Sequence, residues 1–183
     1  MIQRISELIN RYRIFLITAH ERLDGDALGS ELALYHILHS LGKEVTVYNQ
    51  DGTPENYRFL PGSDRIVHEL PPLEPFEVGF ILDCSELERV GREYGRIATL
   101  PNLANIDHHI SNEGFCEAVL VDPLASSTGE MICRLVSHMG LAIHDPFLQV
   151  RLEIEADGLN GDVHEPLDLI RGIDQRHHEL IDP

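Results

Sequence analysis

The chain has 183 residues, of which 43% are hydrophobic and 25% are charged, and its formal net charge is −17. This length suits one well-buried domain with a short extra segment and excludes two full-sized domains. The surplus of negative charge excludes long nucleic acid as a partner, whereas small anionic substrates stay compatible with it.

Short apolar runs of the kind found in buried parallel strands alternate with segments of helical periodicity. The irregular stretch 49–75 interrupts this alternation once, and its five prolines and two glycines break any longer element. The alternation predicts an α/β fold, a mostly parallel five-stranded sheet flanked by helices. The expected strands are 14–19, 45–48, 78–82, 102–107 and 115–121, and the expected helices are 2–12, 27–41, 129–139 and 146–156.

The run 20–30 (HERLDGDALGS) places one imidazole and two carboxylates directly after the first strand. Asp24 and Asp26 flank a single glycine, so their oxygens can converge on one point or on two adjacent points. Two such anions repel each other unless a proton or a cation intervenes. Together with His20 they are plausible ligands for Mn²⁺, Mg²⁺ or Zn²⁺. The alternative is that one of the two aspartates only caps the following helix.

Two further strands also end in residues that can bind a metal. Asp83 follows the strand 78–82, and Asp107, His108 and His109 close the strand 102–107. Taken alone, Asp83 could be a helix N-cap. Because the carboxyl ends of parallel strands meet at one edge of a sheet, the coincidence favours a shared metal site there.

Ser127 and Thr128 stand directly before the expected helix 129–139. Their hydroxyls could bind a phosphate group at the start of that helix. The alternative is that they cap the helix, which Ser and Thr commonly do at this position. The sequence leaves both roles open.

Four segments together resemble the DHH phosphoesterase family. They are HERLDGDALGS, FILDCSELERVG, NIDHHISN and VDPLASSTGEM, and the resemblance covers residues from about 5 to 145. The family takes its name from the triplet that stands here at 107–109. The spacing and flanks are most similar to the bacterial oligoribonuclease and pAp phosphatase branch.

The resemblance implies a dinuclear site at the ends of the first, third and fourth strands. Mn²⁺ is the preferred ion of the family, and Mg²⁺ is the second choice. One ion would be held by His20, Asp24 and Asp83, and the other by Asp26, Asp83 and His108. Asp83 would therefore bridge the two ions.

The resemblance also implies roles for the rest of the triplet. Asp107 would orient the site or coordinate a metal, and His109 would face the scissile phosphate. Ser127 and Thr128 are the substrate-binding candidates. The implied activity is hydrolysis of phosphoester bonds in short oligonucleotides or in nucleotides such as pAp, so small phosphorylated molecules are the expected partners.

Two other functions stay open. One is a pyrophosphatase or exopolyphosphatase that uses the same metals. The other is a truncated, non-catalytic module that binds a metal or a partner, since the family's fourth motif has only Asp157 or Asp162 as stand-ins here. We expect a catalytic domain over 1–145 and a helical and irregular acidic tail over 146–183, without a second full domain.

The location of the protein is expected to be cytoplasmic. No run approaches the roughly 20 apolar residues of a membrane span, and the N-terminus has no signal-peptide pattern, so membrane contact is not expected. Three cysteines without CxxC spacing fit free thiols in a reducing compartment. The absence of a second domain would leave a face exposed, which suggests a homo-oligomer.

Overall fold

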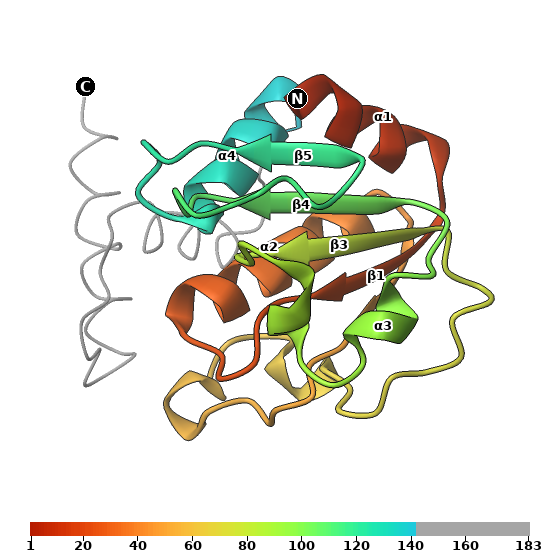
Figure 1. Cartoon of the computed structure of the whole chain (residues 1–183), viewed down its shortest axis with the longest axis vertical. Coiled ribbons are helices and arrows are strands. Elements are labelled where there is room, and N and C mark those ends of the chain that lie inside the picture. The colour runs from red at the N-terminus through yellow and green to blue at the C-terminus, as the bar shows by residue number, and fades with distance from the viewer. Residues whose placement is uncertain (142–183) are drawn as a thin grey trace, which may run out of the picture.

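The computed structural model describes residues 1–141, and the expected helix 146–156, Asp157 and Asp162 lie outside them. Within these residues the five expected strands form one sheet, and every pairing in it is parallel (Figure 1). The predicted α/β fold is thus confirmed. In the order β2-β1-β3-β4-β5, the strands are β1 Ile14–Thr18, β2 Glu44–Val47, β3 Val78–Leu82, β4 Leu103–Asp107 and β5 Ala118–Val121.

The expected helices within the described part of the chain are also present. The second one begins two residues before the expected start, because the Asp24 carboxylate caps it by accepting the Ala27 N–H at 3.0 Å. No helix in residues 1–141 is long and apolar enough to cross a membrane. The helices are α1 Ile2–Arg11, α2 Gly25–Ser40, α3 Tyr94–Ile97 and α4 Thr128–His138, with 3-10 turns η1 Glu55–Tyr57, η2 Ser63–Arg65 and η3 Leu87–Val90.

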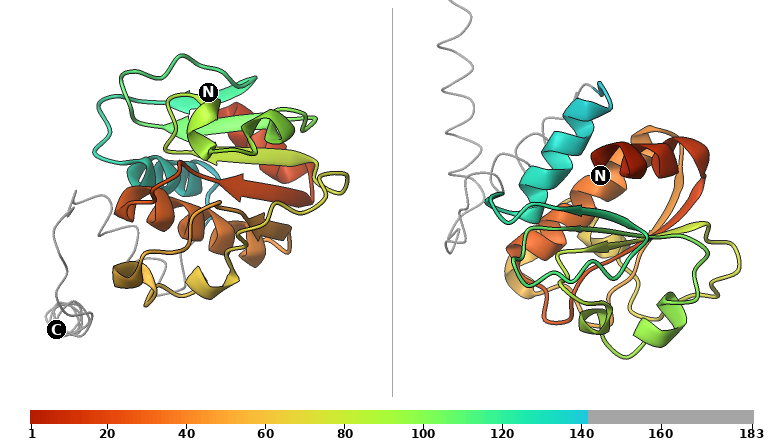
Figure 2. Two further views of the ribbon diagram at one scale, coloured as in Figure 1. Left: turned by 60° about the horizontal axis from the view of Figure 1, so that its bottom comes forward. Right: turned by 45° about the horizontal axis from the view of Figure 1, so that its top comes forward.

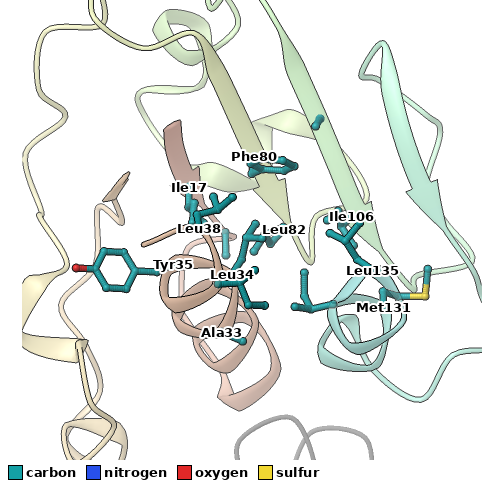
Figure 3. Packing of buried hydrophobic residues seen from close by; sticks show 14 of the residues in the cluster. Ile17, Ala33, Leu34, Tyr35, Leu38, Phe80, Leu82, Ile106, Met131 and Leu135 are labelled. Carbon is teal, nitrogen blue, oxygen red and sulfur yellow. The ribbon is translucent and has the colours of Figure 1, made fainter. Parts of the chain in front are cut away.

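Helices α1, α2 and α4 cover one face of the sheet, and α3 lies on the other face (Figure 2). The main core fills the space between the sheet and the three longer helices. In Figure 3, Leu34 and Leu38 of α2 and Leu135 of α4 lie between their helices and Phe80 and Leu82 of β3. Burying a side chain of this size stabilises the fold by about 1.5–3 kcal/mol. The sheet is therefore held in place by a well-packed core.

The strand order changes direction next to β1. The chain leaves β1 for β2 on one side and then returns to β3 on the other side. The register pairs Thr18 with Ile81 and Leu82 with Ile106, so neighbouring strands end almost level with one another. All strands point the same way (Figure 1), and their carboxyl ends form one edge. Open α/β sheets bind ligands at such an edge, where the strand order reverses.

Candidate metal centre

Asp83 lies at the centre of the side chains that gather at this edge. Its Oδ2 is 3.3 Å from His20 Nε2, which is also 3.7 Å from Asp24 Oδ2. Its Oδ1 is 3.7 Å from His108 Nε2 and 3.6 Å from His109 Nδ1. Two groups of possible metal ligands result, each with ligand atoms within 4.8 Å of one another, and Asp83 belongs to both.

The backbone of Asp83 explains how its side chain reaches both groups. Asp83 has φ +54°, a left-handed conformation that is uncommon outside glycine. The chain therefore turns sharply at the end of β3, and the side chain is buried in the cluster with an exposure of 2%. The N-cap alternative is wrong, because the next helical turn, η3, has Glu86 at its N-cap position. A strained backbone at a cluster of ligand-type side chains is typical of a functional site.

Two histidines present the same nitrogen to the carboxylates. His20 Nδ1 is 2.8 Å from the Glu21 carbonyl oxygen, and His108 Nδ1 is 3.3 Å from the Ala125 carbonyl oxygen. These contacts assign the hydrogen to Nδ1 and leave Nε2 facing the carboxylates. A neutral imidazole held in this way offers its Nε2 lone pair to a cation, as in most histidine metal ligands.

The electrostatics of the cluster also favour a cation. The hydrogen bond with Asp83 raises the pKa of His20, while burial opposes the rise. Burial works to raise the pKa of Asp83, but the hydrogen bonds from His20 and Thr128 outweigh it and hold the pKa below its ordinary value. Burial, and then the charge of Asp83, raise the pKa of Asp26. A divalent cation would relieve the repulsion between these carboxylates.

Asp24 is placed for both of the roles that the sequence left open. Its Oδ1 caps α2, while its Oδ2 lies 3.7 Å from His20 Nε2 in one of the two ligand groups. Its side chain is 59% exposed, so one oxygen remains accessible. Capping and metal binding are therefore compatible for this residue.

Asp26 is held more tightly than the resemblance implies. Its Oδ2 lies 3.3 Å from His108 Nε2, as expected for a shared ion, but it also accepts the Thr128 N–H at 2.9 Å. Its Oδ1 accepts the Gly129 N–H at 3.1 Å. The carboxylate thus satisfies the first N–H groups of α4. Within residues 1–141, the second group of possible ligands contains Asp83, His108 and His109 and not Asp26.

Asp107 holds His109 in place. Its Oδ1 lies 2.6 Å from His109 Nδ1, and its Oδ2 accepts a hydrogen bond from Asn112 Nδ2 at 2.7 Å. Asn112 also bonds the buried Asn105 of β4, at 2.7 Å. With an exposure of 0%, Asp107 is suited to orienting His109 rather than to meeting a ligand. His109 Nδ1 is then occupied, and its Nε2 is the nitrogen left for a substrate.

Asn105 and Asn112, which belong to the hydrogen-bond network around Asp107, were not identified from the sequence. The signal was present, since Asn105 interrupts an apolar strand and Asn112 follows the histidine pair by three residues. A buried amide requires hydrogen-bond partners, and a strand-interior asparagine therefore indicates a polar network nearby.

Ser127 and Thr128 lie at the site, but their hydroxyls are bonded within the protein. Ser127 Oγ accepts the Glu130 N–H at 3.0 Å and so caps α4, the alternative weighed for it. Thr128 Oγ1 donates to Asp83 Oδ1 at 2.9 Å. Both residues are buried, at 5% and 0% exposure. Phosphate binding by the Thr128 hydroxyl would require its bond to Asp83 to be exchanged, whereas Ser127 Oγ is an acceptor in its bond and keeps its own hydrogen to donate.

The chain matches a known family over most of its length. The profile described as "DHH family, N-terminal domain" matches residues 14–157. This range contains every ligand-type side chain of the centre.

Two curated relatives carry the name "Bifunctional oligoribonuclease and PAP phosphatase NrnA". The one from Thermus thermophilus is 34% identical over 125 residues, which cover 68% of this chain and 37% of the relative. The one from Bacillus subtilis is 30% identical over 128 residues, which cover 69% of this chain and 39% of the relative. The chain thus aligns with well under half the length of either relative.

A solved structure has the same fold. It is described as an exopolyphosphatase-related protein from Bacteroides fragilis, with a TM-score of 0.75 and 26% identity. The match covers 96% of this chain and 56% of that one. Here too the chain corresponds to only part of its relative.

Proposed function

This chain belongs to the DHH family, and we propose that it is a metal-dependent phosphoesterase acting on short oligonucleotides or on nucleotides such as pAp. The observation that carries the proposal is the position of Asp83, whose two oxygens face two separate sets of imidazole and carboxylate groups. We propose Mn²⁺ as the ion, with Mg²⁺ as the second choice, since both accept mixed oxygen and imidazole ligands. The names of two relatives support this substrate class.

The imidazole and carboxylate donors are of the kind that such ions bind. His20, Asp24 and Asp83 would hold one ion, and Asp26, Asp83 and His108 would hold the other. Two bound ions would activate a water molecule and offset charge on the phosphoryl oxygens. The residues of the chain supply the rest of the chemistry.

His109 is the proposed acid. Its Nδ1 lies 2.6 Å from Asp107 Oδ1, so the imidazole has a fixed orientation and its Nε2 is left for the substrate. Hydrolysis joins a water oxygen to phosphorus and breaks the ester P–O bond. His109 would give a proton from Nε2 to the leaving oxygen, while Asp107 holds the ring in position for that transfer.

The experiment that tests the proposal is a substrate panel on the full 183-residue chain with Mn²⁺. The panel contains pAp, di- to pentanucleotides, pyrophosphate and polyphosphate. We expect release of phosphate from pAp or of mononucleotides from the short oligonucleotides. Release of neither product would contradict the proposal.

An exopolyphosphatase or pyrophosphatase is the second candidate. The description of the Bacteroides fragilis structure favours it. The same metal ligands would support hydrolysis of phosphoanhydride bonds. Pyrophosphate and polyphosphate in the panel test for this activity. Turnover of these compounds alone would replace the first proposal.

A metal-binding module without turnover is the third candidate, and Asp83→Ala distinguishes it from an inert fold. If the wild-type chain binds Mn²⁺ that Asp83→Ala cannot bind, yet hydrolyses nothing in the panel, the module is supported.

We place the protein in the cytoplasm, where its short phosphorylated substrates are found. Its charge of −17 disfavours long nucleic acid as a partner.

A further inference from the structure

A buried acid on α2 lies close behind the metal centre. Glu31 has an exposure of 0%, and one of its oxygens, Oε1, has no hydrogen-bond partner within residues 1–141. Its other oxygen, Oε2, accepts a hydrogen bond from Asn49 Nδ2 at 2.8 Å. A buried carboxyl group with an unpartnered oxygen costs stability, and an apolar side chain would fill the same space at lower cost.

Asn49 links Glu31 to the segment just after β1 that carries His20. Asn49 Oδ1 accepts the N–H of Ala19 at 3.4 Å. Ala19 is buried and lies one residue beyond the end of β1, so the sheet no longer pairs its N–H. An unpaired buried N–H is costly, and Asn49 Oδ1 accepts this one. The Glu31 carboxyl group also interacts with the Ala19 N–H, which acts to lower the pKa of Glu31.

Glu31 fixes the orientation of the Asn49 amide. A carboxamide can present its oxygen or its NH₂ group in either direction, and only the oxygen can accept the Ala19 N–H. Because Glu31 Oε2 accepts from the NH₂ group, the oxygen must face Ala19. The backbone of Asn49 is fixed as well, since its N–H bonds the Val67 carbonyl at 3.0 Å.

The two residues after Asn49 hold the same loop from the outside. Gln50 Nε2 donates to the Glu21 carboxylate at 3.0 Å, and Asp51 Oδ2 accepts the Arg22 N–H at 2.6 Å. Segment 49–51 therefore makes three hydrogen bonds to the loop between β1 and α2, and of these three only the Asn49 bond is buried.

We propose that Glu31 is a positioning residue which, through Asn49, fixes the buried turn at Ala19 from which His20 enters the metal centre. The inference rests on the proposed function only in taking His20 as a metal ligand. Burial raises the pKa of Glu31 to about 8, against the contact with Asn49, so the group is mainly a neutral acid at neutral pH. A neutral Gln side chain can therefore replace it closely.

The test compares four variants of the full chain. Glu31→Gln keeps an acceptor for Asn49, whereas Glu31→Leu and Asn49→Leu remove the contact. Glu77→Gln is the matched control, because Glu77 Oε2 accepts N–H bonds from Arg13 and Ile14 at the opposite end of β1. Mn²⁺ affinity is measured by calorimetry, and protection of the Ala19 amide is measured by hydrogen exchange without metal.

We expect Glu31→Leu and Asn49→Leu to weaken Mn²⁺ binding by about 10–100-fold, the range for partners that orient metal ligands. We also expect at least about tenfold faster exchange of the Ala19 amide in both, since its hydrogen bond is lost. Glu31→Gln and the control should stay within about twofold of wild type in both measurements, a margin well inside one factor of ten in binding.

Unchanged Ala19 exchange in the two leucine variants would overturn the proposal. So would Mn²⁺ affinity that is unchanged in these variants while the wild type binds the ion. If the wild type binds no Mn²⁺, the proposed function fails, and the exchange of Ala19 still decides the role of Glu31. Should a leucine variant not fold, Asn49→Ser, which shortens the side chain beyond reach of Ala19, replaces it under the same criteria.

Discussion

At the amino end of β1, Glu77 accepts backbone N–H bonds from Arg13 and Ile14 at 2.7 and 3.0 Å, and these bonds lower its pKa. At the carboxyl end of the sheet, burial raises the pKa of Asp26 and of Glu31. A carboxylate at the first edge therefore stabilises the fold. The two acids at the second edge cost stability, which is typical of a site arranged for a ligand rather than for the fold alone.

The largest effect is expected from Asp83→Asn. Asparagine has the same shape and tolerates the left-handed backbone, so the fold is kept while the negative charge and one acceptor oxygen are lost. We expect Mn²⁺ affinity to fall by more than about 100-fold, beyond the range for residues that only orient ligands. Turnover should fall with it, while the far-UV circular dichroism of the metal-free chain stays unchanged. Wild-type affinity in this variant would show that Asp83 is not a ligand.

A smaller effect on turnover is expected from His109→Ala. Loss of a group that stabilises the leaving oxygen lowers turnover by about 10²–10³-fold. Steady-state kinetics with saturating Mn²⁺ measure it. His138→Ala is the control, because His138 lies at the other end of α4 and bonds Gln3 at 3.1 Å. Equal activity in the two variants would remove His109 from the mechanism.

A pH-dependent difference in stability is expected for Glu31→Gln. Glu31 has a folded pKa of about 8, above its ordinary value of 4.5, so ionisation disfavours the folded state. Between pH 4.5 and about pH 8, the free energy of unfolding of the wild type therefore falls with rising pH. Relative to the variant, it falls by up to about 1.4 kcal/mol per pH unit. Below pH 4.5 and above pH 8 the difference is constant. Urea unfolding of both proteins from pH 4 to pH 9, without metal, measures it, and parallel curves would contradict the buried neutral acid.

The smallest effect is expected from Glu77→Gln. The pKa of Glu77 is lowered, so its contribution is present above its ordinary pKa and is lost as the pH falls through the folded value. We expect a slightly lower midpoint of urea unfolding at pH 7 and no change in Mn²⁺ affinity. A loss of metal affinity would mean that the two edges are not independent.

The sequence was sufficient to predict the fold and the edge of the sheet at which the ligand-type side chains meet. Apolar runs gave the parallel strands, and ligand-type residues at three strand ends gave the shared edge. The contacts behind that edge could not be predicted in the same way. Whether Asp26 faces an ion or the N–H groups of α4 depends on how α4 packs 102 residues later in the chain. The pairing of Glu31 with Asn49 likewise joins a helix to a loop across 18 residues, with no local pattern.

The central claim is that Asp83 is shared by two metal ions. Titration of the full chain with Mn²⁺, followed by electron paramagnetic resonance, tests it most directly, because two ions that share a ligand are magnetically coupled. We expect two Mn²⁺ per chain and a coupled spectrum that is lost in Asp83→Asn. A single uncoupled ion, or a coupled pair that persists in Asp83→Asn, would contradict it.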